Sequence, residues 1–516
     1  MMKKMTKVVS LILAMSMIMA SVTACGGNGG GGAKKNSAKD IEIVYWNAGL
    51  GSAWLEAVIE AFNEANPDYN AYFTASAAAG TVNATYGIEG DTVDLYMTTK
   101  LADTSKMEPL DELLATTIEG EAKTIGEKFE PGYLALEKAN DDHYYQLTYG
   151  GGVCGIVYNM DHFKEAGITQ LPRTTNELAI AADKLKTNGK KAFCHFANNG
   201  YWTYMSEAWF SQYEGFDYYL NNFYACVDEK GNSPSKEILK KQDGRYEVLK
   251  AYGKLITPEY IMEGSNSIDH VSAQTQFLNG SAAMMVTGSW LSSEMAASDK
   301  FGSFSMMRTP VLSAVTDNCK TVKSENVLRD VISAIDSVLD GEKTIEDYKS
   351  GKNYKVEGKE ISAADWDYVY EARLSVPTNY SGEGCFIPTY SNAKDGAKAF
   401  LEFLYSDEGL KTYAKAVSVP LPLELSDGTT VDMSAMNDFQ KSQFKMLAES
   451  VATPTYDNAG KHRIFIDGGA KSFAGLNYIT YLCASNPSDR KTVNQIWDEM
   501  MQTVDDNYDT WVADIK

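Results

Sequence analysis

The sequence predicts an α/β protein with largely parallel sheets, organised in two or more lobes. Short runs of β-branched and aromatic residues alternate along the chain with segments of helical periodicity, which is typical of this class. The chain has 516 residues, which is too long for one compact core. Its hydrophobic fraction of 44% and charged fraction of 22% are those of an ordinary globular protein.

The predicted elements begin with a strand at residues 41–46, followed by a helix that Ser52 caps and Asn66-Pro67 ends. A second strand is predicted over residues 91–97, with Thr98-Thr99-Lys100 leaving its carboxyl end. Both strands are therefore expected to end in loops at the same edge of a sheet.

The middle of the chain continues the alternation. The segment 144–149 enters Gly150-Gly151-Gly152, and residues 153–158 form the next predicted strand. Thr174 and Glu177 have capping-box spacing at the start of a helix that ends before Gly189.

The remaining elements complete the pattern. Residues 282–286 are a small, apolar, buried strand that leads into Gly288-Ser289-Trp290. Residues 313–360 indicate an inserted, largely helical surface element. A strand at 386–387, a helix at 392–405 and helices within 436–516 follow.

The chain is strongly acidic, with 69 acidic and 47 basic side chains and a net charge of −22. Recognition of nucleic-acid phosphates needs clustered Lys and Arg. A DNA or RNA partner is therefore excluded.

The first residues are typical of a secretory signal peptide. Lys3, Lys4 and Lys7 precede an apolar run over residues 8–20. This run is shorter than the ~20 residues that a bilayer-spanning helix needs, but it suits the apolar region of a signal peptide.

Small residues precede Cys25 in Val22-Thr23-Ala24-Cys25, which resembles the bacterial lipobox. In that motif the cysteine receives a diacylglyceryl group and becomes the mature N-terminus. We therefore predict a signal peptide at 1–24, lipidation at Cys25 and a flexible glycine-rich tether over 25–39. No later stretch reaches 18 uninterrupted apolar residues, so we expect membrane attachment through the lipid only.

The other six cysteines are widely spread and include no Cys-x-x-Cys pair, which favours buried thiols over disulfides. These are Cys154, Cys194, Cys226, Cys319, Cys385 and Cys483.

Several blocks of sequence, taken in order, carry a family resemblance. They are Trp46-Asn47 with Phe62-Asn63-Glu64-Ala65-Asn66-Pro67-Asp68, Met107-Glu108-Pro109-Leu110-Asp111-Glu112-Leu113, the segment 158–168, Phe277-Leu278-Asn279-Gly280 with Gly288-Ser289-Trp290, and Ser406-Asp407-Glu408-Gly409-Leu410 with Pro420-Leu421-Pro422. Together they resemble the bacterial extracellular solute-binding proteins of ABC transporters, carbohydrate type (family 1, maltose-binding-protein-like).

The resemblance implies a two-lobed, periplasmic-binding-protein-like α/β fold of type II, with a hinge between the lobes and a ligand cleft at their interface. Lobe one would take residues 40–149 and 376–425. Lobe two would take 150–375 and 426–516, with insertions at about 215–270 and 313–375. Gly150-Gly151-Gly152 can absorb the backbone changes of a hinge, although a tight β-bulge would also explain these glycines.

The implied function is that of a lipid-anchored receptor which binds a sugar or oligosaccharide and delivers it to ABC permease subunits. We expect a monomer without a cofactor or metal. Two alternatives stay open: a receptor for a non-sugar polar solute, and a surface lipoprotein that binds or cleaves glycans.

A sugar site needs aromatic rings for the flat C–H faces and fixed polar groups for the hydroxyls. Trp290 is the strongest candidate, because it follows a strand-end turn and resembles the family's stacking tryptophan. Core packing is the alternative for Trp290 and Trp54. The predicted ligand-binding residues are Trp290, Trp202, Tyr201, Asn198, Asn199, Asn47, Trp54, Thr98, Thr99, Lys100, Tyr149, Gly150, Trp209, Asn477 and Tyr478.

Enzyme signatures are mostly lacking. The sequence has no Gly-x-Ser-x-Gly, no phosphate-binding Gly-x4-Gly-Lys-Ser/Thr and no His-Glu-x-x-His motif. Its five histidines are scattered, which argues against a His-rich metal site. Glycoside hydrolysis needs only two carboxylates and stays open on composition alone.

Overall fold

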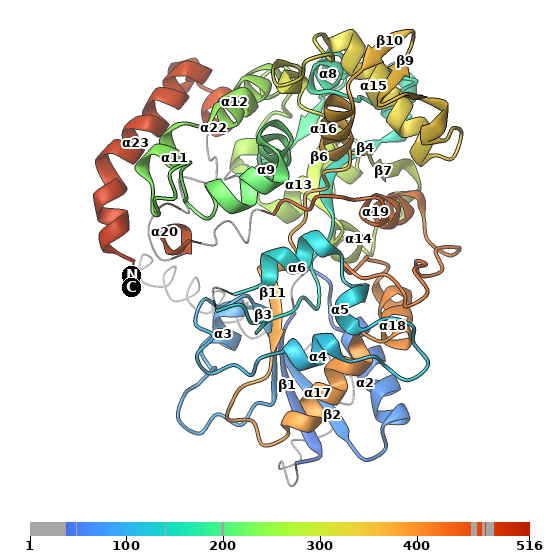
Figure 1. The fold of residues 1–516 in the computed structure, drawn as a ribbon, viewed down its shortest axis with the longest axis vertical. Coiled ribbons are helices and arrows are strands. Elements are labelled where there is room, and N and C mark those ends of the chain that lie inside the picture. The colour runs from blue at the N-terminus through green and yellow to red at the C-terminus, as the bar shows by residue number, and fades with distance from the viewer. Residues whose placement is uncertain are drawn as a thin grey trace, which may run out of the picture.

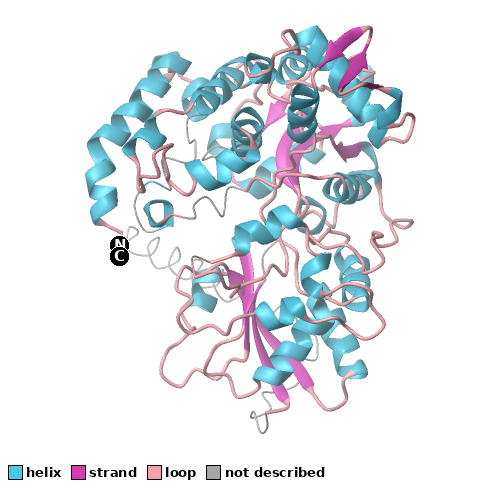
Figure 2. Cartoon of the chain, in the orientation of Figure 1, coloured by secondary structure: helices cyan, strands magenta, loops and turns pink. Residues whose placement is uncertain are grey.

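A computed structural model describes residues 38–515 except 48, 140, 198–200, 456–461, 467–469 and 471–478. The predicted signal peptide, Cys25, Asn198, Asn199, Asn477 and Tyr478 lie outside the described residues. The chain forms two lobes, one above the other in Figure 1, each with a four-stranded sheet surrounded by helices (Figure 2).

Lobe one, the lower lobe in Figure 1, is built on a sheet of order β11-β3-β1-β2. β1 pairs in parallel with β2 and β3, whereas β11 runs antiparallel to β3 with Glu383 opposite Thr99. The ends of β1 and β3 and the start of β11 therefore share one edge. The strands are β1 (Asp40–Trp46), β2 (Asn70–Ser76), β3 (Leu95–Thr99) and β11 (Glu383–Phe386).

The helices of lobe one cover this sheet. In α2 the residues Trp54, Leu55, Val58, Ile59 and Phe62 are buried, at the spacing of one helical face. The helices are α2 (Ala53–Ala65), α3 (Ala79–Asn83), α4 (Asp111–Ala115), α5 (Ile125–Lys128), α6 (Pro131–Glu137), α17 (Lys394–Leu404) and α18 (Asp407–Val417).

Lobe two has a sheet of order β5-β6-β4-β7. β5 is parallel to β6, but β4 is antiparallel to both β6 and β7. The expectation of largely parallel sheets was therefore wrong for β4 and for β11. Both strands enter their sheets directly from connections between the lobes, not from crossover helices. The strands are β4 (Cys154–Asn159), β5 (Phe193–Cys194), β6 (Met284–Gly288) and β7 (Phe304–Met306).

The helices of lobe two surround its sheet. The predicted cap of α8 is confirmed, since the Thr174 hydroxyl accepts a hydrogen bond from the Glu177 backbone N–H at 3.2 Å. The helices are α7 (Met160–Glu165), α8 (Thr175–Thr187), α9 (Trp202–Glu214), α10 (Phe216–Tyr218), α11 (Lys236–Lys240), α12 (Asp243–Leu255), α13 (His270–Leu278), α14 (Leu291–Glu294), α15 (Glu325–Leu339), α16 (Ala363–Arg373), α19 (Asp438–Ala448), α20 (Arg463–Ile466), α22 (Ile479–Leu482) and α23 (Val493–Ala513).

The inserted segment at 313–360 is only partly helical. Its long helix α15 is followed by a three-stranded antiparallel sheet, β8 (Lys349–Ser350), β9 (Asn353–Val356) and β10 (Lys359–Ile361). Short helical turns lie at η1 (Tyr219–Phe223, π-helical) and at the 3₁₀ segments η2 (Ser265–Ser267), η3 (Phe301–Ser303), η4 (Ser313–Asp317), η5 (Ile345–Asp347), η6 (Tyr380–Gly382) and η7 (Pro487–Asp489).

Within the described ranges, three connections run between the lobes. The first, residues 147–154, lies beside the second, residues 375–385: Leu147 pairs with Cys385 and Val153 with Thr378. Residues 452–455 lie along the other side of the second connection, with Thr455 opposite Thr378. The third connection joins α18 to α19 over residues 418–437.

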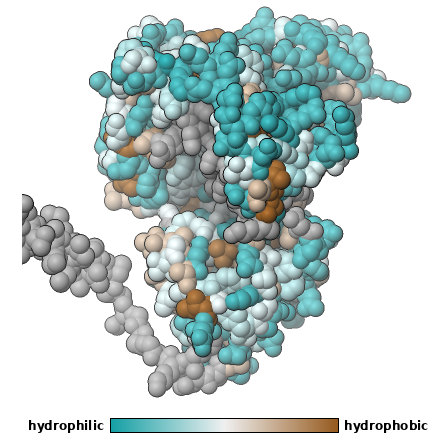
Figure 3. All heavy atoms as spheres, turned by 90° about the vertical axis from the view of Figure 1, so that its left-hand side faces the viewer, coloured by the Kyte–Doolittle hydropathy of each residue, from teal (hydrophilic) through white to brown (hydrophobic). Residues whose placement is uncertain are grey.

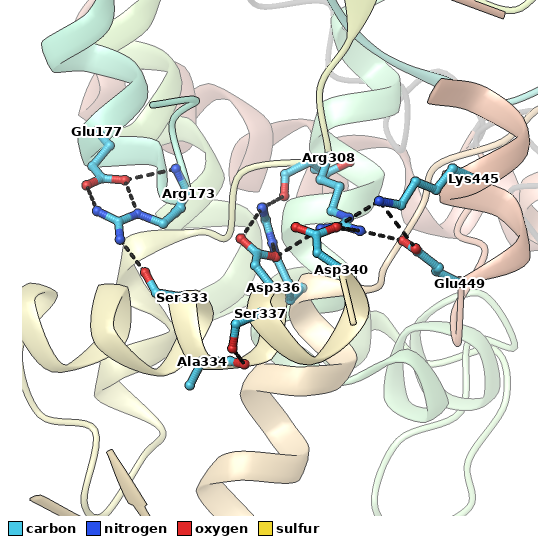
Figure 4. Close-up of polar contacts among 12 residues, drawn as sticks. Arg173, Glu177, Arg308, Ser333, Ala334, Asp336, Ser337, Asp340, Lys445 and Glu449 are labelled. Carbon is cyan, nitrogen blue, oxygen red and sulfur yellow. Dashed lines mark hydrogen bonds and ion pairs between the residues drawn. The ribbon is translucent and has the colours of Figure 1, made fainter. Parts of the chain in front are cut away.

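A network of ion pairs fastens the inserted helices to lobe two (Figure 4). Arg373 of α16 donates two hydrogen bonds to Asp336 of α15, at 2.8 and 2.9 Å. Arg308, which follows β7, donates to Glu449 at 2.7 Å and to Asp336 at 3.4 Å. At the outer side of the network, Lys445 of α19 forms an ion pair with Asp340.

The six cysteines in the described part of the chain are buried free thiols, so the preference for thiols is confirmed. Among the described helices, none has the length and apolar character that crossing a membrane requires.

Candidate functional site

The edge of the lobe-one sheet that carries the ends of β1 and β3 faces lobe two (Figure 1). Thr98 and Thr99 are the last residues of β3, not a loop beyond it, because β11 extends the pairing to Thr99. Asn83 accepts a hydrogen bond from the Thr98 hydroxyl at 2.6 Å and donates to Thr99 at 2.9 Å. Lys100 forms an ion pair with buried Glu137 at 2.7 Å.

The facing edge of lobe two carries a group of aromatic residues. Because β5 and β6 are parallel, the segments that follow both strands leave the sheet at one edge. The Trp290 ring lies edge-on to Tyr201, with centroids 5.4 Å apart, and 6.1 Å from the Tyr204 ring. Phe196 lies edge-on to Tyr201 at 4.7 Å. These four residues are called the aromatic cluster below.

Trp290 is held in one orientation by its own turn. A Cβ atom at Gly288 would lie 2.1 Å from the Trp290 ring, so the indole packs directly over the backbone of this glycine. The hydroxyl of the intervening Ser289 accepts a hydrogen bond from the Val153 N–H at 3.0 Å. Trp290 is 7% exposed, and its indole N–H has no hydrogen-bond partner among the described residues. Such a buried donor can bind an acceptor on a ligand.

The two lobes touch beside this tryptophan. A Cβ atom at Gly49, in the loop after β1, would lie 3.1 Å from the Trp290 Cβ and 2.9 Å from a Glu294 oxygen. The other Glu294 oxygen accepts a hydrogen bond from Gln274 at 2.6 Å. Burial raises the pKa of Glu294 above its ordinary value.

Glu294 and Tyr204 were not among the predicted site residues. Glu294 lies four residues after Trp290, which is the spacing of one helical turn and was a usable signal. Tyr204 could not be found in this way, because its position beside Trp290 depends on how α9, the helix that carries it, packs in lobe two.

Five of the predicted ligand residues are at most 1% exposed in this structure: Trp54, Thr98, Tyr149, Trp202 and Trp209. Trp54 donates to the Tyr45 hydroxyl at 3.1 Å and stacks on Tyr149 at 6.2 Å, which fits the core-packing alternative. Trp209 donates to the Pro310 carbonyl at 2.9 Å.

Trp202, also a predicted ligand residue, lies in the interior of lobe two. It is the first residue of α9, a helix buried along most of its length, and it packs edge-on against Phe193 and Tyr252 at 5.1 and 5.6 Å. Tyr201, directly before it, stays half-exposed with a φ of 67°.

The glycine triplet lies where the first connection leaves lobe one. A Cβ atom at Gly150 would lie 2.4 Å from a Glu383 oxygen, and one at Gly152 would lie 2.5 Å from the Ser289 side chain. Gly151 has a φ of 86°, a conformation that favours glycine. Asn47, on the loop after β1, is half-buried and donates its backbone N–H to Ser76 at 2.8 Å.

The described residues hold no group of three or more His, Cys, Asp or Glu side chains placed to bind a metal ion. His195 is buried near the aromatic cluster and its ring bonds Asn266 at 2.7 Å. Burial lowers the pKa of His195 to about 4, so this imidazole is neutral at physiological pH.

Residues 47–316 match the sequence model of the bacterial extracellular solute-binding proteins. This match spans more than half of the chain, and the chain belongs to that family. The resemblance found from the sequence blocks is thus confirmed. A search of curated protein sequences found no match.

Solved structures share the two-lobed fold. The GacH receptor of Streptomyces glaucescens GLA.O is 15% identical, with a TM-score of 0.58 over 92% of this chain and 100% of that chain. RafE from Streptococcus pneumoniae is 16% identical, with a TM-score of 0.57 over 91% and 100%. A chitin oligosaccharide binding protein is 16% identical, with a TM-score of 0.56 over 91% and 99%. The predicted two-lobed α/β fold is therefore confirmed.

Proposed function

We propose that this protein is a lipid-anchored extracellular receptor of an ABC importer. It binds a sugar or oligosaccharide between its lobes, without covalent chemistry, and delivers it to the membrane permease. The lipid at Cys25 and the glycine-rich tether would keep the receptor close to that permease.

The observation that carries the proposal is the aromatic cluster at the lobe interface. Trp290 offers a ring to the C–H face of a sugar, and its unpaired indole N–H offers a donor to a ring or hydroxyl oxygen. Glu294 offers an acceptor beside that ring. Proteins with the same fold were solved with acarbose (GacH) and with raffinose (RafE), which supports a saccharide as the ligand class.

The connections between the lobes support a hinge. Gly150-Gly151-Gly152 lie in the first connection, which is bonded to the second by the Asn379 N–H to the Gly152 carbonyl, at 3.1 Å. A change in φ and ψ at these glycines would move one lobe relative to the other. Ligand binding would then shift the population from open to closed lobes.

Titration calorimetry against a panel of mono- and oligosaccharides tests the proposal, with Trp290→Ala as the diagnostic variant. Loss of a central stacking ring costs about 2 kcal/mol or more, so we expect sugar affinity to fall at least about 30-fold. Trp497→Ala is the matched control, because Trp497 lies on the outer helix α23 and packs against Tyr246 of α12. Its affinity should equal that of the wild type.

Two results would contradict the proposal. One is a wild-type protein that binds no saccharide of the panel but binds another class of solute. The other is a folded Trp290→Ala variant that binds sugar as tightly as the wild type.

A further inference from the structure

A cavity of about 620 Å³ lies between lobe one and the short helix α20 of lobe two. Its volume is within the range of small-molecule sites. Lobe one contributes residues 102–105, Met107, Pro109, Asp141 and Tyr145, and lobe two contributes Arg463. Figure 1 shows α20 on the lobe-two side of the interface, above α3 and the end of β3.

The lobe-one wall continues from the site already described. Residues 102–109 follow Lys100 and therefore leave the same edge of the sheet as β3. This wall is held firmly: the Gln146 side chain both donates to and accepts from the Leu101 backbone, at 2.8 and 2.9 Å. The Glu108 N–H donates to the Ile387 carbonyl at 2.8 Å. The cavity thus has a preformed wall.

The lining residues combine the groups that a sugar ring needs. The Tyr145 hydroxyl donates to Asp141 at 2.8 Å, which orients that carboxylate beside an aromatic ring. Hydrogen bonds from Ser105, followed by the charges of Lys106 and Arg463, lower the pKa of Asp103, so this group is an ionised acceptor. Arg463 supplies planar N–H donors from the opposite lobe.

The side chains that line the cavity carry both negative and positive charge, and this combination favours an uncharged ligand. Asp103 and Asp141 accept hydrogen bonds and Arg463 donates them, so a neutral group with several hydroxyls can satisfy both kinds. An anion would face the two carboxylates, and a cation would face the guanidinium. A hydroxyl-rich, uncharged ring fits all three side chains.

We propose that this cavity is an outer carbohydrate subsite, which holds a distal sugar residue of an oligosaccharide whose inner residue stacks on Trp290. The proposal rests on the proposed function and makes it more specific, since it selects oligosaccharides over single sugars. A ligand in this subsite contacts both lobes and stabilises their closed arrangement.

The test is calorimetry with two length series, maltose to maltohexaose and chitobiose to chitohexaose, with glucose and N-acetylglucosamine as single-sugar references. In the series that binds, wild-type affinity should rise with chain length. Arg463→Met and Asp103→Asn should lower the affinity for the longest members about tenfold, the effect of one hydrogen bond to a charged group. Both should leave the shortest bound member unchanged.

Arg490→Met is the matched control, because Arg490 is an exposed lobe-two arginine that donates to the Ala484 carbonyl. Tyr145→Phe is a second, milder probe, which keeps the ring and removes the hydroxyl that orients Asp141. Thermal melts should show all four variants folded.

The possible results distinguish a failure of the outer subsite from a failure of the proposed function. The outer subsite would be overturned if wild-type affinity did not rise with oligosaccharide length, or if Arg463→Met and Asp103→Asn weakened the binding of short and long members equally. In either case the effect of Trp290→Ala on sugar affinity would still test the proposed function. Binding of no saccharide at all would overturn both.

Discussion

Trp290 and Trp54 both follow a strand of a central sheet, but their indole N–H groups have different environments. Trp54 is 0% exposed and donates to Tyr45. The N–H of Trp290 has no partner in the part of the chain that the structure describes. Gly288 fixes where the Trp290 ring lies, because a side chain at that position would collide with the indole that lies over its own turn. A single small residue therefore keeps this ring at the lobe interface.

Glu207 of α9 is a buried acid whose ionisation should control stability. Its carboxylate accepts a hydrogen bond from the Tyr224 hydroxyl at 2.6 Å, and burial raises the pKa of Glu207 from 4.5 to about 7. Between these two pH values the unfolded chain loses this proton and the folded chain keeps it. The unfolded state then binds fewer protons, so the free energy of unfolding falls as pH rises.

We expect Glu207→Gln to remove this dependence, because the amide cannot ionise. From pH 4.5 to 7 the variant should gain about 3 kcal/mol in free energy of unfolding relative to the wild type. Urea unfolding at a series of pH values measures the difference, with the exposed Glu263→Gln as control. A difference that stays constant over this range would show that Glu207 ionises normally.

At the scale of elements, the ion pairs of the network in Figure 4 should contribute unequally to the free energy of unfolding, the buried pairs more than the exposed ones. Arg373 is 6% exposed at its side chain and would be left without its double hydrogen bond to Asp336. Removing one partner of a buried ion pair costs about 3–5 kcal/mol, because the other charge stays buried. We expect Asp336→Ala to destabilise lobe two by this amount.

Lys445, at the outer side of the same network, is the matched comparison. It is 51% exposed, and exposed ion pairs contribute about 0–1 kcal/mol. Lys445→Ala should therefore change the free energy of unfolding by less than about 1 kcal/mol in the same denaturation experiment. Equal losses for Asp336→Ala and Lys445→Ala would contradict this account of the network.

The elements that local sequence determines were predictable, and those that depend on distant pairing were not. The face of α2 and the cap of α8 follow from residues within one or two turns. The second strand was placed four residues early, at 91–97, because Asp91 instead accepts hydrogen bonds from Gly87 and Val93 in a turn. The direction of β4 depends on its partners β6 and β7, which lie far away in the chain.

The same limit applies to the candidate site. Trp290 could be selected because its turn, Gly288-Ser289, is local. Trp202 and Trp209 could not be recognised as buried, because α9 packs against α12, α16, β4 and β6, none of which is adjacent to α9 in sequence. The place of Tyr204 in the aromatic cluster could not be predicted either, because it also depends on the packing of α9.

At the scale of the whole molecule, the contact between Gly49 and α14 should decide how far the lobes close. Added side-chain atoms at Gly49 would meet Trp290 and Glu294 of the other lobe at 3.1 Å or less. Gly49→Val should therefore act as a wedge that destabilises the closed arrangement and leaves each lobe folded. In the proposed function the ligand binds the closed form, so its apparent affinity should fall in proportion to the population of that form.

Small-angle scattering and calorimetry together measure this effect. With saturating saccharide, Gly49→Val should keep a larger radius of gyration than the wild type and bind at least about tenfold more weakly, since a wedge that costs about 1.4 kcal/mol changes the equilibrium tenfold. Ala53→Val adds the same kind of volume at an exposed position of the neighbouring helix start and should match the wild type in both measurements. A Gly49→Val protein that closes and binds like the wild type would mean that the lobes do not need this contact, and that the ligand is held without bringing α14 against the loop after β1.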